Sequence, residues 1–366
     1  MNVLSGVVGA VLVLTIVSDL LVTVALPRAA RRGRLSRYVW RGGWTAVRAV
    51  ADRVRSASLR ESMLGAYGPL SVFLVLAVWI VLLIFGYGLI VYALRDQISP
   101  RPADLPSALY LGGTALLTLS YANDAGTGLA AKVVGLLAAS TGLVMIALVI
   151  TFLFSLYAAF REREIEVITL EARAGAPPSG VAFLEFHAQY HLEHEIAPAF
   201  DRWQRWAAAV LDSHLAYPIL AYFRSSHDHD SWISSLGAIM DAATLVLTTI
   251  EGGPVGAAKM ALWVGGHCID DLADYFGFRR SGDAGIDLAD FRNARERLER
   301  AGYRLQPEAE AWEKFQRLRS EHAGSLNALA AYWATPPSEW IGETSTHFQH
   351  PGERPARARS RSSAPR

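Results

Sequence analysis

Three long apolar runs constrain this chain more than any other feature of its sequence. They cover residues 3–26, interrupted only by Asp19, residues 65–94 and residues 133–160, and the last two contain no charged residue. About 20 mostly apolar residues are enough to cross the hydrocarbon core of a bilayer as an α-helix. The sequence therefore predicts an integral membrane protein with three membrane-spanning helices. A cleaved signal peptide is the alternative for the first run, which lacks a basic start and an obvious cleavage site.

The rest of the chain has a different composition, so the sequence divides into parts. Overall 52% of the residues are hydrophobic and 19% are charged, and the charges lie mostly outside the three runs. The predicted parts are a first transmembrane helix (1–27), a basic cytoplasmic segment (28–64), a second membrane unit (65–160), a helical cytoplasmic domain (161–346) and a disordered basic tail (347–366). The single cysteine, Cys268, excludes an intrachain disulfide and a cysteine-based zinc site.

Arginine sets the orientation of the spans. The arginines between the first and second runs are Arg28, Arg31, Arg32, Arg34, Arg37, Arg41, Arg48, Arg53, Arg55 and Arg60, whereas residues 95–132 carry only Arg95, Arg101 and Lys132. Short loops rich in Lys and Arg stay on the cytoplasmic side. We therefore expect a multi-pass protein of the cell membrane, with residues 28–64 and everything after 160 in the cytoplasm and residues 95–132 outside.

Residues 28–64 carry an amphipathic pattern. Trp40 and Trp44 fall on one helical face, and Arg41, Arg48 and Arg55 fall on another. This predicts a helix lying on the inner leaflet with its tryptophans inserted and its arginines near lipid phosphates. A helix packed on the cytoplasmic domain is the alternative. For Asp19 in the first run we expect a structural role, either with a partner such as Arg28 or exposed at the interface.

The stretch between the second and third runs suggests a function. Residues 106–117 read PSALYLGGTALL, which is apolar but too short to cross a bilayer, and residues 118–124 follow as TLSYAND. A short helix and a loop between two full spans indicate a re-entrant element. Because irregular backbone at membrane depth is tolerated only beside protein or a water-filled path, such an element favours a pore.

The order of span, short helix, T-x-x-Y-x-[ND] and span resembles the two-helix pore module of the bacterial potassium-channel family, over about residues 71–157. The resemblance implies a homotetrameric pore for K⁺ and places Thr118, Leu119, Ser120, Tyr121 and Ala122 in an ion-binding selectivity filter made of carbonyl oxygens. It also implies that the C-terminal end of the short helix, near residue 117, points at the pore axis. Residues 222–225, 232–247 and 335–342 are weakly similar to the cytoplasmic extension of the same family.

This sequence departs from the family pattern in the filter itself. Ser120 and Ala122 stand where the family has glycines, and Asn123 replaces its acidic residue. The left-handed conformation used there costs a residue with a side chain roughly 1–2 kcal/mol, or on the order of 10 kcal/mol over a tetramer. A selective channel, a wider nonselective cation channel and a non-conducting scaffold or sensor all stay open. Gly142 in the third run is either a gating hinge or a helix-packing position.

Residues after 160 predict an all-α domain. Helical patterns cover about 184–206, 231–249, 256–276, 286–301 and 307–333, with a break at 175–178 and Ser179 as the cap of the next helix. The run 232–247 is apolar but short, and it contains Asp241. It therefore favours a buried core helix over a fourth span.

Histidines offer a metal site as a third possibility. His187, His191 and His194 have the i, i+4, i+7 spacing of one helical face, and His227–Asp230 and His267 with Asp270 and Asp271 are further candidates. No HExxH, GxSxG or phosphate-loop motif accompanies them. We therefore expect structural or solvated histidines, no enzyme activity, no cofactor beyond a permeant ion and no nucleic-acid partner. A membrane-tethered metalloprotein remains the alternative.

Overall fold

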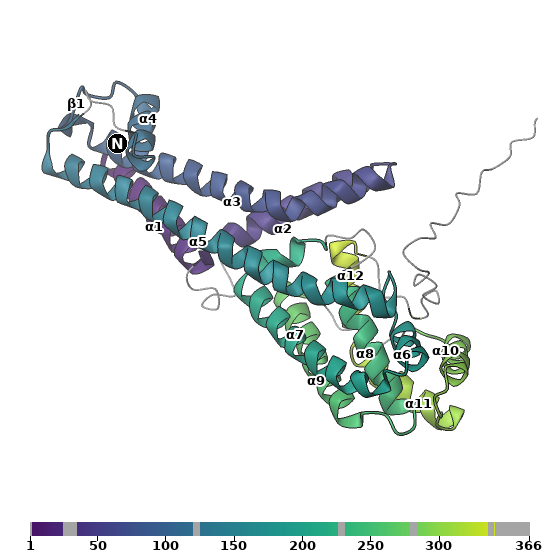
Figure 1. The fold of residues 1–366 in the computed structure, drawn as a ribbon. Helices are drawn as coiled ribbons and strands as arrows, with labels where there is room; N and C mark the ends of the chain where they lie inside the picture. The colour runs from purple at the N-terminus through teal and green to yellow at the C-terminus, as the bar shows by residue number, and fades with distance from the viewer. Residues whose placement is uncertain are drawn as a thin grey trace, which may run out of the picture.

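The protein is all-α, with three long apolar helices at one end and a helical domain at the other (Figure 1). The computed structural model describes residues 2–24, 35–119, 125–225, 231–278, 285–335 and 340. The α-helices are α1 Asn2–Val24, α2 Leu35–Ala51, α3 Ala57–Ala93, α4 Leu105–Leu116, α5 Leu129–Ala174, α6 Gly180–Gln189, α7 Ile196–Ala216, α8 Trp232–Thr248, α9 Val255–Phe276, α10 Leu288–Arg300, α11 Glu308–Ser320 and α12 Ala323–Trp333. Two short strands, β1 Ile98–Ser99 and β2 Ala125–Gly126, pair antiparallel.

Helices α1, α3 and α5 contain the three predicted spans, and each is long and apolar enough to cross a membrane. Both α3 and α5 are longer than the apolar runs. Ser56 begins α3 early, because its side chain accepts a hydrogen bond from the amide of Leu59. Helix α5 continues past residue 160 because Val167 and Leu170 are buried against the helical domain. It ends before Gly175, whose φ is 82°, so the predicted break is confirmed.

Asp19 joins α1 to two neighbouring helices, which confirms its predicted structural role. Its carboxylate accepts hydrogen bonds from the amides of Leu35 (2.9 Å) and Ser36 (3.3 Å), the first residues of α2. It also accepts one from the indole of Trp79 on α3 at 2.8 Å. A buried carboxylate needs such donors, and here they fix the start of α2. The suggested partner Arg28 lies outside the described residues.

The tryptophans of α2 do not face lipid, so their predicted insertion into the inner leaflet is wrong. Trp40 and Trp44 are buried. The indole of Trp44 donates to the carbonyl of Tyr332 at 3.1 Å, and its ring packs against Tyr67 and Tyr222 with centroids 5.4 and 5.8 Å apart. The alternative, a helix packed on protein, is confirmed. Aromatic contacts and an indole hydrogen bond inside the protein favour this arrangement.

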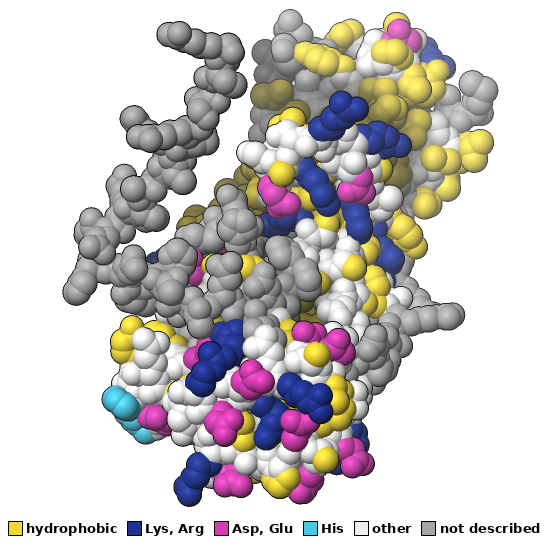
Figure 2. Space-filling view, turned by 90° about the vertical axis from the view of Figure 1, so that its right-hand side faces the viewer, with side chains coloured by type: hydrophobic (Ala, Val, Ile, Leu, Met, Phe, Trp, Pro, Cys, Tyr) yellow, Lys and Arg dark blue, Asp and Glu magenta, His cyan; other side chains and the backbone are white. Residues whose placement is uncertain are grey.

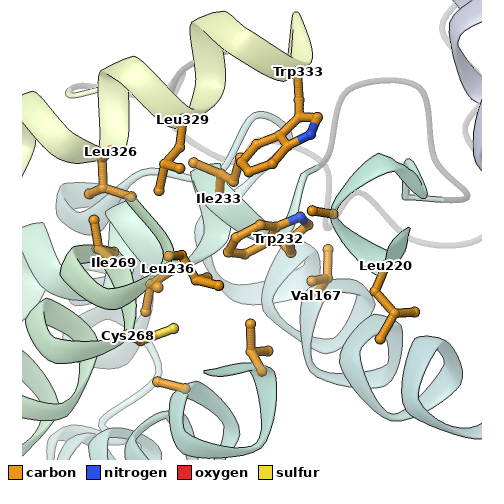
Figure 3. Close-up of a cluster of buried hydrophobic side chains, with 14 of the residues drawn as sticks. Val167, Leu220, Trp232, Ile233, Leu236, Cys268, Ile269, Leu326, Leu329 and Trp333 are labelled. Atoms are coloured by element: carbon orange, nitrogen blue, oxygen red, sulfur yellow. The ribbon is translucent and has the colours of Figure 1, made fainter. Parts of the chain in front are cut away.

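Helix α8 is the centre of the helical domain, as predicted for a core helix. All of its residues except Leu247 are buried, and α5, α6, α7, α9, α11 and α12 contact it. Figure 3 shows Trp232, Ile233 and Leu236 packed among side chains of α9 and α12. Ser231 and Ser234 form a capping box at its N-terminus.

Two predicted helices are each divided in the structure. The stretch 184–206 breaks after Gln189, and His191 adopts a left-handed conformation (φ 55°) before α7 begins. The stretch 307–333 breaks between α11 and α12. The other three predicted helices of the domain, 231–249, 256–276 and 286–301, start and end within about two residues of α8, α9 and α10. Ser179 caps α6 as expected, since its side chain accepts from the amide of Ala182 at 3.4 Å.

Candidate functional site

The segment that connects α3 to α5 has its two ends side by side, because the residues that follow α3 pair with those that precede α5. Ile98 pairs with Gly126 and Ser99 with Ala125, and the amide of Thr127 donates to the carbonyl of Gln97 at 2.8 Å. Helix α4 lies within this excursion. Figure 1 shows it beside the end of α3 and the start of α5, at the end of the molecule away from the helical domain.

Local capping starts α4 at a fixed point. The side chain of Asp104 accepts hydrogen bonds from the amide (2.9 Å) and hydroxyl (2.5 Å) of Ser107. These bonds lower the pKa of the Asp104 carboxyl. A proline at the start of a helix adds to this signal, because its missing N–H would have no partner there.

Helix α4 packs backbone to backbone on α3. A Cβ on Gly112 would lie 2.6 Å from the amide nitrogen of Gly88, and a Cβ on Gly88 would lie 2.7 Å from the Cα of Leu109. Glycine is the residue that permits such an approach. Helix α3 also contacts α5, because the hydroxyl groups of Tyr87 on α3 and Thr141 on α5 are 2.6 Å apart. The three helices therefore form one tightly joined unit.

The C-terminal end of α4 reaches the middle of the apolar part of α5. A Cβ on Gly142 would overlap the carbonyl oxygen of Leu116, the last residue of α4. Gly142 is thirteen residues into α5, so this contact lies about 20 Å along the helix from its start. The structure thus gives Gly142 a packing role, and α5 runs through it without a break. A hinge at Gly142 remains a prediction.

Thr118, the first residue of the predicted filter, has a strained backbone. The amide of Leu119 bonds the carbonyl of Thr114 (2.8 Å), and that of Thr118 bonds Ala115 (3.2 Å), which is a Schellman ending with Thr118 in the left-handed position. Its φ is 56°. Glycine is the usual residue here, and a β-branched residue with positive φ is a genuine outlier. Ser120, Tyr121 and Ala122 lie outside the described residues.

One side of α5 is left uncovered along its apolar length. The exposed residues Ser140, Val144, Ala147, Thr151 and Phe154 recur at helical spacing on the side opposite to Gly142. The hydroxyl of Thr151 donates to the carbonyl of Ala147 at 3.0 Å. A hydroxyl satisfied by its own helix does not need water, so this face suits either lipid or another protein chain.

The histidines do not form the metal site that was kept as an alternative. His187 is buried with Nδ1 2.7 Å from the carbonyl of Phe183, while His191 follows the end of α6, and exposed His194 lies 3.7 Å from Glu195. Their common face required a continuous helix, and the chain breaks between them. His267 lies 3.7 Å from Asp271, and residues 227–230 are outside the described part. Among the described residues no three metal-ligating side chains come together.

A buried polar cluster joins α5 to the helical domain, and the sequence analysis missed it. Arg163 is buried and donates to the carbonyls of Leu220 (3.0 Å) and Phe223 (2.8 Å), and its guanidinium lies 2.9 Å from Glu164. His214 lies 3.3 Å from it. Burial and the nearby Arg163 lower the pKa of His214 to about 3. A signal existed, because residue 163 shares its helical face with Leu156, Val167 and Leu170.

No family model, curated protein or solved structure matches this chain. The function is therefore inferred from the chemistry and geometry of the chain itself.

Proposed function

We propose that this protein is a passive cation channel of the potassium-channel type, formed by four copies of the chain in the cell membrane. Each copy contributes α3, α4, the segment 118–124 and α5, and the helical domain lies in the cytoplasm. Residues 118–122 form the narrow part of the pore. The observation that carries this proposal is the position of α4, whose last carbonyl lies against Gly142, about 20 Å along α5 from its start and within its apolar part.

The position of α4 supports a re-entrant role. Both ends of residues 98–126 are held together by the β1–β2 pairing, so this segment does not cross to the other side. A 12-residue helix is about 18 Å long, too short for the roughly 30 Å core of a bilayer but long enough to reach its middle. Polar backbone at that depth needs a surrounding of protein or water. A water-filled path between copies of the chain meets this need, because it is lined by protein and contains water.

The strain at Thr118 supports the same location for the pore. A residue in a sparsely populated backbone region persists when its surroundings impose it, and such residues cluster at functional sites. Thr118 ends α4 and starts the segment that resembles a filter. Its φ of 56° turns the chain where a re-entrant segment has to reverse direction.

The uncovered face of α5 supports assembly around a central path. Ser140, Ala147 and Thr151 are small or hydroxylated and exposed in a single copy. Water in a pore tolerates such residues, whereas the large apolar side chains of Ile146 and Ile150, also exposed, suit lipid. Val144 and Phe154 lie on the same side of α5 as the small residues, so this face offers both a wettable path and apolar contact with neighbouring copies.

Ion flux through the purified full chain in liposomes tests the proposal, with potassium and sodium gradients applied separately. We expect potassium flux above that of protein-free liposomes. Ser120→Gly with Ala122→Gly restores the residues that adopt left-handed angles without strain. This double variant is expected to raise the ratio of potassium to sodium flux. Intact tetramers without flux in both proteins would instead favour the non-conducting scaffold.

Two glycines of α5 give a matched pair of variants. Gly142→Leu drives a side chain into the carbonyl of Leu116 and displaces α4, so flux is expected to be lost. Gly135 lies two turns earlier on the same helix, and a Cβ there meets nothing within 4 Å. Gly135→Leu is therefore expected to keep flux. Equal flux from the two variants would show that the α4 contact does not matter for conduction.

A further inference from the structure

Helix α2 and the first turns of α3 form a hairpin with one face covered by protein. The hydroxyl of Tyr67 donates to the carbonyl of Trp40, and a Cβ on Gly43 would lie 2.8 Å from that hydroxyl. Arg48 donates to the carbonyl of Tyr332 at 2.9 Å. The tyrosine contacts join α3 to α2, and the Arg48 contact fixes the hairpin on the helical domain. The part of the hairpin surface that stays exposed is its open side.

The open side combines arginines with apolar side chains. Arg41, Arg53 and Arg55 are exposed. Tyr38, Val50 and Leu59 are 67%, 51% and 54% exposed. Figure 2 shows Lys and Arg gathered across the middle of this view, between the apolar end of the molecule and the domain with mixed charges. Apolar residues scattered singly over a surface are common, so the charge of the open side is the feature that indicates a partner.

The acidic residues of the hairpin are already paired. Asp52 lies 3.7 Å from Arg60 and 4.0 Å from Arg48, and Glu61 binds Arg224. Over residues 35–64 there are six arginines against two acidic residues, a net charge of +4. Within the described residues, Arg41, Arg53 and Arg55 have no acidic partner. The open side therefore fits a negatively charged partner.

The chain itself places the hairpin at a membrane surface. Helix α3 has 37 residues and is about 55 Å long, so it extends well beyond the roughly 30 Å hydrocarbon core. The hairpin is that extension together with α2, which begins eleven residues after α1 ends. In Figure 1 its tip diverges from α5 and from the domain, so neither covers it.

We propose that the hairpin binds anionic lipid headgroups of the adjacent leaflet through Arg41, Arg53 and Arg55. Tyr38, Val50 and Leu59 enter the interfacial region beside these headgroups, where amphipathic and apolar side chains are stabilised. Each surface arginine contributes about five-fold to the affinity for an anionic membrane. Lipid fits better than an acidic protein, because both ends of the hairpin continue toward membrane-spanning helices. This binding does not depend on ion conduction.

A fluorophore on the hairpin tests the proposal. Ala49→Cys puts a thiol on the exposed face of α2, one turn from Arg53. The only other cysteine, Cys268, is buried, and burial raises its pKa to about 12, so it does not compete for the label. The labelled full chain is reconstituted into phosphatidylcholine liposomes with or without about one quarter phosphatidylglycerol. We expect a blue shift of the emission only with the anionic lipid, and its loss at about 0.5 M salt.

Two triple variants with equal charge change separate specific binding from net charge. Arg41→Gln, Arg53→Gln and Arg55→Gln are expected to abolish the blue shift. Arg300→Gln, Arg304→Gln and Arg317→Gln remove three exposed arginines of the helical domain and are expected to keep it. Equal emission in the two lipids, or equal loss in the two variants, would overturn the proposal. A shift caused by a soluble polyglutamate peptide but not by anionic lipid would identify an acidic protein as the partner instead.

Discussion

Helices α5 and α8 are both rich in apolar residues, but the protein covers only one of them. The apolar window of α5 is 22% buried, whereas every residue of α8 except Leu247 is buried. The apolar run of α5 contains no charged residue and is preceded by Lys132, whereas α8 contains Asp241. Lys132 of α5 lies near the helix end and is exposed, while Asp241 of α8 is buried and paired with Arg319 at 2.7 Å.

The difference shows that high hydropathy predicts a helix shielded from water, but does not say whether the protein's own helices shield it. Helix α8 has 17 residues and is about 25 Å long, too short for a bilayer, so six helices of its own chain surround it. Helix α5 is long enough to cross, and the described part of its own chain leaves most of its apolar window uncovered. A polar group inside α8 therefore needs a partner within the same chain, and removing that partner tests the comparison most severely.

The largest expected effect is on the buried ion pair. Arg319→Met leaves the carboxylate of Asp241 buried without its cation, which costs about 3–5 kcal/mol in the free energy of unfolding. We expect the helical domain to unfold at a much lower temperature than in the wild type, measured by circular dichroism of the full chain in detergent. The spans keep their helicity, since they contain no part of this pair.

Two controls distinguish the buried pair from charge loss in general. Lys314→Met removes an exposed partner of Glu310 on the same helix, and it is expected to lower the unfolding temperature far less, because water screens an exposed ion pair. Asp241→Leu combined with Arg319→Met removes both charges and is expected to recover most of the stability. If Arg319→Met melted like Lys314→Met, α8 would not depend on internal pairing.

The sequence predicts the two helices equally well, because period and length suffice for both. The three spans, the core helix at 232–247, the cap at Ser179 and the break at 175–178 follow from patterns that act within one element. The short helix before Thr118 is recognisable for the same reason. Ser120, Tyr121 and Ala122 of the filter lie outside the described part, so only its first two residues, Thr118 and Leu119, and Gly142 have been compared with the prediction.

Errors occurred where a side chain's surroundings come from distant parts of the chain. Trp40 and Trp44 looked like membrane anchors, because nothing local reveals the carbonyl of Tyr332 that Trp44 binds. The sequence does not single out Arg163, because the carbonyls of residues 220 and 223 that accept its hydrogen bonds are distant in the chain. The alternative of a metal site on His187, His191 and His194 fails because the left-handed residue His191 lies where the helix breaks. Each case depends on tertiary contacts.

The stability of the helical domain is expected to fall at acidic pH, because its buried imidazoles resist protonation. Burial lowers the pKa of His322 to about 4 and that of His214 to about 3. In the unfolded chain both titrate near 6.5, so below that pH the unfolded state binds protons that the folded state does not. Stability is unaffected above pH 7.5 and falls as the pH drops below 6.5, by about 1.4 kcal/mol for each group at pH 5.5.

The unfolding midpoint of the domain between pH 7.5 and 5.5 measures this effect. His322→Gln is expected to make the midpoint less dependent on pH than in the wild type, since one of the groups no longer contributes. His267→Gln, on the exposed part of α9, serves as the control and should keep the wild-type dependence. A wild-type midpoint that does not change with pH would show that these buried imidazoles do not stay neutral in the folded domain.

The smallest expected effect is at Thr118, on the membrane side of the comparison. Thr118→Gly removes the Cβ from a left-handed residue, which relieves roughly 1 kcal/mol of strain. If the strain serves only the turn at the end of α4, the thermal midpoint of the full chain rises slightly and flux is unchanged. If the midpoint rises but flux falls, the threonine has a role that repays its strain, as expected for the first residue of a filter. A lower midpoint would mean that its side chain stabilises the turn by more than the strain costs, and the link between strain and function at this position would be lost.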